Sequence, residues 1–257
     1  MTWLSIVLGA ALAAAPADAP APPPYALLTL PSGHVFRVLS SGPVLDANGK
    51  RLALGISYQS SAQSRKALYA EAEELFEYLR PHAEHEQDGA VMVIARFGSG
   101  SDVVDLDSLY QRQKSGNWKR TARADKPLPK AQPPPAEEER DLTGMRDAKE
   151  KADAWLSLLD SARFADSWEG TAPPLREQSS RDSWAQSAGS VRAAVGKPQR
   201  RKLISLLETR TIPSGPPGHY VILEYLSSFD RKSEAFETVT QMLCDDGEWR
   251  VAGYALR

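Results

Sequence analysis

Residues 218–257 read GHYVILEYLSSFDRKSEAFETVTQMLCDDGEWRVAGYALR, and they limit the possible folds more than any other stretch of the chain. Runs rich in β-branched and aromatic residues, which favour strands, fill most of this stretch. The predicted strands are 219–229, 234–244 and 249–256. Polar turns separate them, and Asp246-Gly247 suits a tight hairpin because glycine tolerates positive φ. The stretch therefore predicts an antiparallel β-meander, and a further strand-like run over 202–209 precedes it.

Helical periodicity comes before these strands. Apolar residues recur at intervals of three and four, which places them on one face of a helix. In the first predicted helix they are Ala148, Ala152, Trp155, Leu159 and Ala162. A short second helix is predicted over 164–168, ending before Pro173-Pro174. The third begins at the N-cap candidate Ser180 and is closed by Gly196, and its apolar face consists of Trp184, Ala188, Val191 and Val195. Helices followed by a meander indicate an α+β domain.

A segment rich in proline and charge divides the chain. It spans 123–143, contains almost no large apolar residue, and changes from basic to acidic along its length. Because proline removes backbone donors and this composition cannot bury a core, we interpret the segment as a semi-rigid linker. It separates an N-terminal domain (25–122) from a C-terminal domain (144–257), and a shorter Pro-rich spacer (18–24) precedes the first domain.

The N-terminal domain reads as a small α+β layer of the order β-β-β-α-β. Its strand-like runs are 26–30, 35–39, 52–58 and 90–97. The first two flank Pro31-Ser32-Gly33, which favours a tight turn and hence a hairpin. The helix is predicted to stop at Pro81, and its apolar face consists of Leu68, Ala72, Leu75, Phe76 and Leu79. The turn residues 114–117 allow a further hairpin between Tyr110 and Trp118.

The overall charge is close to balanced. The 257 residues include 31 basic and 33 acidic ones, which give a net charge of −2. This balance produces no field that would attract nucleic acid or an anionic membrane. We therefore expect no nucleic-acid partner.

The N-terminus has the pattern of an export signal. Residues 4–15 are apolar or small and uncharged, and the run is shorter than the roughly 20 residues that span a bilayer as a helix. Ala15 and Ala17 fit the small-residue cleavage rule, so residues 1–17 are predicted to be a signal peptide, although no Lys or Arg precedes the apolar run. The alternative is a disordered Ala/Pro tail. We expect a soluble periplasmic or secreted protein with no stable membrane insertion after cleavage.

The single cysteine, Cys244, excludes an intramolecular disulfide. It lies in a run of strand character, far from the predicted cleavage site, so it offers no thiol for a lipid anchor there. We interpret it as a small core residue rather than a nucleophile.

Spaced motifs in the C-terminal domain resemble a known family. They are Ala154-Trp155 with Leu159-Asp160, Phe164-Ala165-Asp166-Ser167-Trp168, Trp184 and Arg192, Gly218-His219-Tyr220-Val221, Glu237-Thr238-Val239-Thr240, and 246–254. Over about residues 145–257 they resemble the bacterial domain of unknown function 4019. The resemblance implies a cystatin-like, nuclear-transport-factor-like cone, with three helices in the concave face of a curved four-stranded antiparallel sheet. It implies no activity, because the family has no established one. No resemblance is identified for the N-terminal domain.

Signatures of nucleotide-binding and hydrolase sites are absent from the sequence. Gly98-Ser99-Gly100 lacks the spacing and the following helix of a phosphate-binding turn, and no serine lies in a Gly-x-Ser-x-Gly motif. His82 and His85 could face one metal ion only if their helix continued past Pro81, and otherwise form a solvated helix exit. We predict no cofactor and no metal site.

Four residues of the meander are candidates for catalysis. Folds of the cone type host isomerases and dehydratases that use a buried acid with a nearby tyrosine. The candidates here are Glu224, Glu237, Tyr225 and Tyr254. Alternation places Tyr225 on the strand face of Val221 and Leu223, and Glu224 on the other face. A carboxylate buried on an apolar face would have a raised pKa, but pairing of Glu224 or Glu237 with Arg201, Arg210 or Arg250 across the sheet is the more common arrangement.

Three tryptophans are candidates for a ligand pocket. Trp155, Trp168 and Trp184 all lie where a helix would face the sheet. They could form an aromatic platform for a ligand, or they could fill the core, as large aromatic residues commonly do.

Three functional interpretations follow. The first is a non-catalytic module that binds an unknown protein or small ligand. The second is an isomerase-like or dehydratase-like enzyme that uses a buried glutamate and a tyrosine. The third is a homodimer formed through the sheet face, because both faces of the strand around Val221 and Ile222 carry apolar residues. A cavity lined by a carboxylate without a basic partner would favour the enzyme, and an interior filled by tryptophan would favour the binding module.

Overall fold

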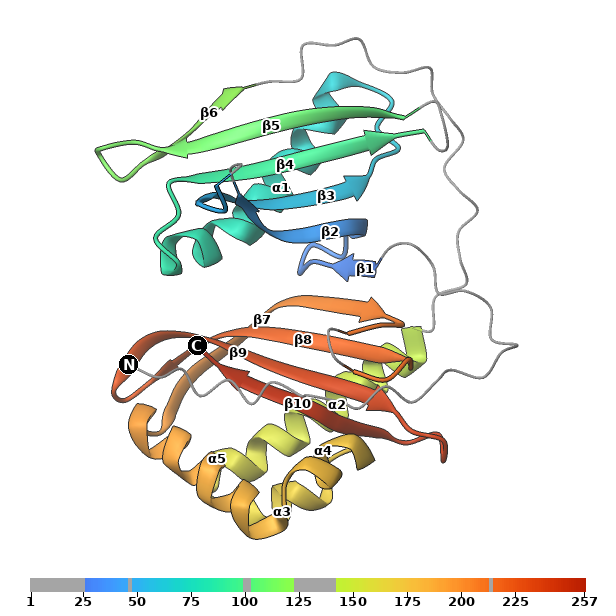
Figure 1. Cartoon of the computed structure of the whole chain (residues 1–257), viewed down its shortest axis with the longest axis vertical. Coiled ribbons are helices and arrows are strands. Elements are labelled where there is room, and N and C mark those ends of the chain that lie inside the picture. Colours follow the sequence, from blue (N-terminus) through green and yellow to red (C-terminus); the bar gives the residue numbers. More distant parts are fainter. Residues whose placement is uncertain (1–25, 46–47, 99–102, 123–141, 213–214) are drawn as a thin grey trace. The chain divides into compact units, whose positions relative to one another are not determined.

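The computed structural model describes residues 26–45, 48–98, 103–122, 142–212 and 215–257. These residues form a mixed α+β protein with five helices and ten strands (Figure 1). The cone implied by the family resemblance would contain only four of these strands. The predicted signal peptide (1–17), the spacer (18–24) and residues 123–141 of the predicted linker lie outside the described residues. The last two linker positions, Leu142 and Thr143, belong to the first C-terminal helix instead.

The chain divides into two compact units, and each is described by itself. Of the described residues, the N-terminal unit contains those in 26–28 and 34–122, and the C-terminal unit contains those in 29–33 and 142–257. No helix of the described residues is both long enough and apolar enough to cross a membrane.

The N-terminal unit continues beyond the expected β-β-β-α-β order. Its elements are β1 (Ala26–Thr29), β2 (Val35–Leu45), β3 (Arg51–Gln59), α1 (Arg65–His85), β4 (Ala90–Phe97), β5 (Val104–Arg112) and β6 (Trp118–Ala122). The strands follow the order β1-β2-β3-β4-β5-β6. β3 and β4 are parallel, with α1 as the crossover, and β4, β5 and β6 are antiparallel neighbours. The hairpin allowed by the turn at 114–117 is confirmed as β5 and β6.

Helix α1 has the predicted apolar face. It begins at the N-cap Ser64, whose Oγ accepts a hydrogen bond from the Ala67 amide, and all five predicted face residues are buried. The prediction that the helix stops at Pro81 is wrong, because it continues to His85. A proline removes one backbone donor from the helix. Here tertiary contacts hold the last turn: Ala83 is fully buried, and the Trp118 indole donates to Glu84 Oε1 at 2.8 Å.

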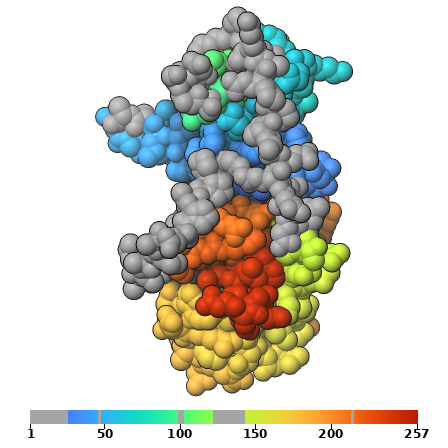
Figure 2. Space-filling view, turned by 90° about the vertical axis from the view of Figure 1, so that its right-hand side faces the viewer, coloured from blue at the N-terminus to red at the C-terminus, as the bar shows by residue number. Residues whose placement is uncertain are grey.

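The C-terminal unit consists of helices followed by a meander. Its elements are α2 (Leu142–Asp160), α3 (Phe164–Glu169), α4 (Pro173–Gln178), α5 (Arg181–Val195), β7 (Pro198–Thr209), β8 (Tyr220–Phe229), β9 (Lys232–Leu243) and β10 (Trp249–Leu256). The antiparallel order is β10-β9-β8-β7, so the predicted meander is confirmed. Figure 1 shows helices α2 to α5 on one face of these strands, and in Figure 2 the helices (yellow) and the last strands (red) share the visible surface of this unit.

Two helix predictions need correction. The described part of the unit has four helices rather than three, because Pro173-Pro174 begins α4 instead of breaking the chain. Proline is well suited to the first helical turn, where its missing N–H would have no partner in any case. Ala162 is not part of the first helical face, since α2 ends at Asp160 and Ala162 has a positive φ of 57°.

The core of the C-terminal unit lies between the helices and one face of the meander. Val221, Leu223 and Tyr225 of β8 point into it, as alternation predicts. The helices contribute Trp155 and Trp184. The remaining buried members are Met145, Ala148, Ala152, Leu156, Leu159, Leu175, Ala188, Val239, Trp249, Val251 and Tyr254. Cys244 is only half-buried and lies just beyond the end of β9, beside Tyr220 and Ala252.

Candidate functional site

The candidate carboxylate Glu237 lies on β9 and is completely buried. Its Oε1 accepts a hydrogen bond from the Tyr254 hydroxyl at 2.8 Å. Its Oε2 accepts from Arg201 Nε at 2.6 Å and from Ser227 Oγ at 3.0 Å. Two of the four catalytic candidates, Glu237 and Tyr254, are therefore in direct contact.

Two arginines neutralise this carboxylate. Arg192 Nη1 of α5 lies 3.4 Å from Glu237 Oε1, in addition to the contact from Arg201 of β7. Asp160, the last residue of α2, bridges the same two arginines: it accepts from Arg192 Nη2 at 2.5 Å and from Arg201 Nη1 at 2.8 Å. The four charged groups form a closed network that joins both helices to the sheet.

The surroundings of the network shift the pKa values of its neighbours. Burial opposes the charge of Arg201, but the hydrogen bonds to Asp160 and Glu237 raise the pKa of its guanidinium above the ordinary value. Burial, followed by the negative charge of Glu237, raises the pKa of the Tyr254 phenol well above its usual 10. Both groups therefore stay protonated at neutral pH. The site contains fixed ion pairs and a neutral phenol.

The side chains of the other two catalytic candidates have partners other than Glu237. Tyr225 lies opposite Glu237 in the strand register, but its hydroxyl donates to Asp153 Oδ1 of α2 at 2.7 Å. Burial, with that hydrogen bond, raises the pKa of Tyr225. Glu224 lies on the opposite face of β8, where its carboxylate is 3.5 Å from Arg257 Nη2 and accepts from Ser205 Oγ at 3.5 Å. Alternation therefore separates the two candidate glutamates onto different faces of the sheet.

The tryptophan candidates pack into the core and use their indole N–H groups locally. Trp155 donates to the carbonyl of Ser167 at 2.7 Å, and Trp184 donates to Ser167 Oγ at 2.9 Å. The Trp155 and Trp184 rings lie 5.8 Å apart. Trp168 packs against the same core and donates to the Ser179 carbonyl at 3.0 Å. These contacts fix the short helix α3 between α2 and α5.

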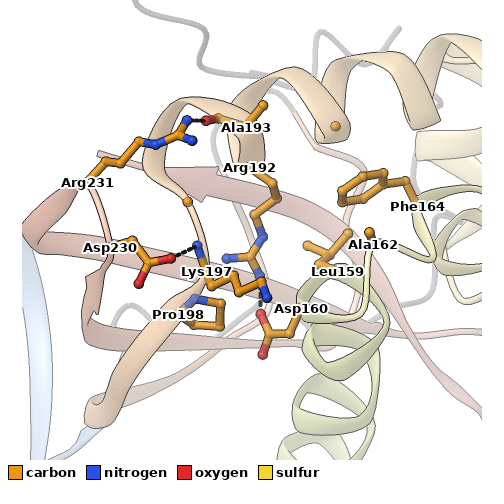
Figure 3. A pocket seen from close by; sticks show the side chains of 12 residues that line it. Leu159, Asp160, Ala162, Phe164, Arg192, Ala193, Lys197, Pro198, Asp230 and Arg231 are labelled. Carbon is orange, nitrogen blue, oxygen red and sulfur yellow. Dashed lines mark hydrogen bonds and ion pairs between the residues drawn. The ribbon is translucent and has the colours of Figure 1, made fainter.

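A pocket of about 420 Å³ opens beside the charged network (Figure 3). It lies where the ends of α2 and α5 meet the start of β7 and the turn between β8 and β9. Its apolar lining includes Leu159, Phe164 and Pro198. Its charged lining consists of Asp160, Arg192, Lys197, Asp230 and Arg231.

Helix α5 and the turn after it shape this pocket. Gly196 closes α5 with a φ of 83°, a region that favours glycine, and a Cβ there would lie 2.9 Å from Asp230 Cβ. The amide of Lys197 donates to Asp230 Oδ2 at 3.1 Å, and Arg231 Nη1 donates to the Ala193 carbonyl at 2.5 Å. The backbone of the pocket is thus fixed on both sides.

Arg192 is the residue that sequence reasoning missed. It belongs to one of the motifs of the family resemblance, but the sequence alone assigns it no role. Only 6% of it is exposed, and it lies on the buried face of α5, four residues after Ala188 and three before Val195. The sequence signal for Arg192 is therefore a charged residue at a position where the helical pattern requires an apolar one. Among the described residues, Arg192 Nε has no hydrogen-bond partner.

The histidines do not converge. His82 and His85 share the last turn of α1 because the helix passes Pro81. His219 lies next to Glu208, with 2.7 Å between Nε2 and Oε1, and His34 Nδ1 lies 2.9 Å from Glu74 Oε2. Within the described ranges, no group of three or more His, Cys, Asp or Glu side chains is arranged to hold a metal ion.

Comparison with known proteins identifies one family. Residues 151–254 match the family described as Protein of unknown function (DUF4019), which confirms the resemblance found in the motifs. The match lies within the C-terminal unit and includes Asp160, Arg192, Glu237 and Tyr254. No curated protein and no solved structure matches the chain.

Proposed function

We propose that the C-terminal unit is a non-catalytic module that binds a small organic anion in the pocket beside Arg192. The ligand class is a carboxylate on an apolar body. The observation that carries the proposal is the buried guanidinium of Arg192, which lines the pocket and has a donor, Nε, without a partner among the described residues.

The charges around the pocket favour an anion. Three cations and two carboxylates line it, and one of those carboxylates, Asp160, is also bound by Arg201 outside the lining. Lys197 and Arg231 lie at the exposed rim and have no carboxylate partner in the described structure. A carboxylate placed between them would gain charge-assisted hydrogen bonds, while Leu159 and Phe164 would contact its apolar part.

The network around Glu237 supports binding rather than catalysis. A general base needs a lone pair that can reach a substrate proton. Both carboxylate oxygens of Glu237 are already bound, one by Arg201 and Ser227 and the other by Tyr254, and Glu237 does not line the pocket. An isomerase-like or dehydratase-like enzyme would require a carboxylate that faces a cavity without a basic partner.

The same unit is proposed to be a cystatin-like cone. All four helices contribute to or pack on one apolar face of the meander. Register shifts interrupt the β7–β8, β8–β9 and β9–β10 pairs, and such bulges bend strands. Both features are typical of a curved sheet that holds helices in its concave face.

Calorimetric titration of the full chain with benzoate tests the proposal. Benzoate combines a carboxylate with an apolar ring, and benzyl alcohol is the neutral control. The double variant Lys197→Gln/Arg231→Gln should weaken benzoate binding about tenfold or more, because it removes two charged donors. The matched control is Arg200→Gln/Lys202→Gln, which makes the same charge change at exposed positions of β7 outside the pocket.

Three results would contradict the proposal. Benzoate could fail to bind the wild-type chain, it could bind no better than benzyl alcohol, or both double variants could lose the same affinity. The last result would mean that only the general charge of the surface attracts the anion.

A further inference from the structure

A second pocket, of about 430 Å³, lies elsewhere in the C-terminal unit. It is formed by α2, the segment after α3 and the β9–β10 hairpin. The indole side chains of Trp155 and Trp249 belong to its lining, as does the completely buried Gln241. The residues that line the anion pocket are all different.

Gln241 is a polar residue at a buried position of the sheet. It points to the helix-facing side of β9, in register with Val221 of β8 and Val251 of β10, both of which are completely buried. Within the described residues neither Oε1 nor Nε2 of its carboxamide has a hydrogen-bond partner. A buried amide without partners lowers the stability of a fold, so an apolar residue would suit this position better.

The backbone around this pocket is held firmly in place. The amide of Val251 donates to the Gly170 carbonyl at 3.0 Å, and the Val251 carbonyl accepts from the Ala172 amide at 2.8 Å. Gly170 also allows the close approach of Trp155, because a Cβ there would lie 3.0 Å from Trp155 Cδ1. The pocket therefore does not depend on a loose loop.

The charges around the second pocket are balanced. Lys151 and Arg250 are matched by Glu169 and Glu248, and Lys151 Nζ is paired with Glu248 Oε2 at 2.8 Å. Arg250 is paired outside the lining with Asp246, with 2.6 Å between Nη2 and Oδ2. This balance favours an uncharged ligand, in contrast to the anion pocket.

We propose that the second pocket binds an uncharged planar ligand that carries a carboxamide. The carboxamide of Gln241 presents one acceptor and two N–H donors. A ligand amide presents the complementary acceptor and donor side by side, so the two groups can form a pair of hydrogen bonds. The indole rings supply flat apolar surface for the ring of the ligand. This inference is independent of the anion site, since the two pockets share no lining residue.

Benzamide is the probe, and benzoate is its charged counterpart of nearly the same shape. The full chain is labelled with ¹⁵N, and the indole N–H resonances are followed as each compound is added. Benzamide should shift the signals of Trp155 and Trp249 more than the signal of Trp184, which does not line the pocket. Benzoate should leave all three nearly unchanged, or shift them at least tenfold more weakly for the same concentration.

The decisive variant is Gln241→Leu, with Gln186→Leu on the exposed surface of α5 as the matched control. Gln241→Leu should weaken benzamide binding at least tenfold while the chain unfolds at a higher temperature than the wild type. A variant that merely damaged the fold would unfold at a lower temperature, so the two effects are separable.

The proposal would be overturned by any of three results. Benzamide could cause no shift at Trp155 or Trp249 in the wild-type chain up to its solubility limit. Gln241→Leu could bind benzamide as well as the wild type does. Benzoate could bind this site as tightly as benzamide, which would exclude an uncharged ligand class.

Discussion

Glu237 shows how a buried charge can belong to the structure rather than to a reaction. It is completely buried, and four side chains contact its carboxylate: Tyr254, Ser227, Arg201 and Arg192. Moving a carboxylate out of water is costly unless ion pairs and hydrogen bonds compensate for the lost hydration. The arrangement provides both, and it leaves Arg192 Nε without a hydrogen-bond partner among the described residues.

Replacing Glu237 by Gln should destabilise the chain. The change keeps the shape of the side chain but leaves Arg192 and Arg201 with one carboxylate, Asp160, between them. Removing one partner of a buried ion pair costs about 3–5 kcal/mol of the free energy of unfolding. Urea denaturation followed by circular dichroism measures the difference. Glu234→Gln, at an exposed position of the same strand, should change it by less than about 0.5 kcal/mol.

Stability should also fall in alkaline solution. The pKa values of Tyr225 and Tyr254 are raised in the folded chain, in both cases chiefly by burial, and in the unfolded chain they return to about 10. A raised folded pKa means that the unfolded state loses its proton first. The stabilisation is therefore complete below about pH 10 and is lost as pH rises from there toward the folded pKa values.

Parallel titrations of absorbance and circular dichroism test this expectation. Tyrosinate absorbance from the buried phenols should appear together with loss of secondary structure rather than before it. Tyr58 and Tyr110 of the N-terminal unit, whose pKa values are raised first by burial, should behave in the same way. Ionisation of all eight tyrosines near pH 10 in a chain that stays folded would contradict the assignment of these phenols as buried.

At the scale of helices and strands, the spacing of apolar residues predicted more of the structure than the positions of the prolines did. The meander, the face of α1, most of the faces of α2 and α5, and the side of β8 that carries Tyr225 followed from spacing and alternation. The exceptions are Ala162, which lies beyond the end of α2, and Val191, which is only partly buried while Arg192 takes the buried position on α5. Two of the errors came from treating proline as a stop. Pro81 lies inside α1 and Pro173 begins α4, because tertiary contacts and the position within the helix decide what a proline does.

The contacts of the candidate site could be predicted only in part. Alternation along β9 places Glu237, Val239 and Gln241 on one face, so the sequence contained the signal for Gln241. Pairing of Glu237 with Arg201 is one of the alternatives that the sequence offers. The link from Arg192 to Asp160 was not predicted, because it joins residues 32 positions apart whose distance depends on how α2 and α5 pack.

At the scale of the whole molecule, each unit has its own buried residues. Leu75 of α1 and Leu156 of α2 are both completely buried, one in each unit. A leucine-to-alanine change at such a position costs about 2–5 kcal/mol. If the units unfold separately, Leu75→Ala should lower the temperature of one calorimetric transition and Leu156→Ala that of another. A single transition that both variants shift equally would show that the units unfold together.

We propose that the C-terminal unit binds a small organic anion beside Arg192 and uses no catalytic carboxylate at that site. Mapping of benzoate on the ¹⁵N-labelled full chain tests it most directly. The largest shifts of the backbone amides should occur at Ala193, Lys197 and Arg231, and they should disappear in Lys197→Gln/Arg231→Gln. Absence of shifts at these residues, or shifts centred on Glu224 and its neighbours on the opposite face of β8, would contradict it.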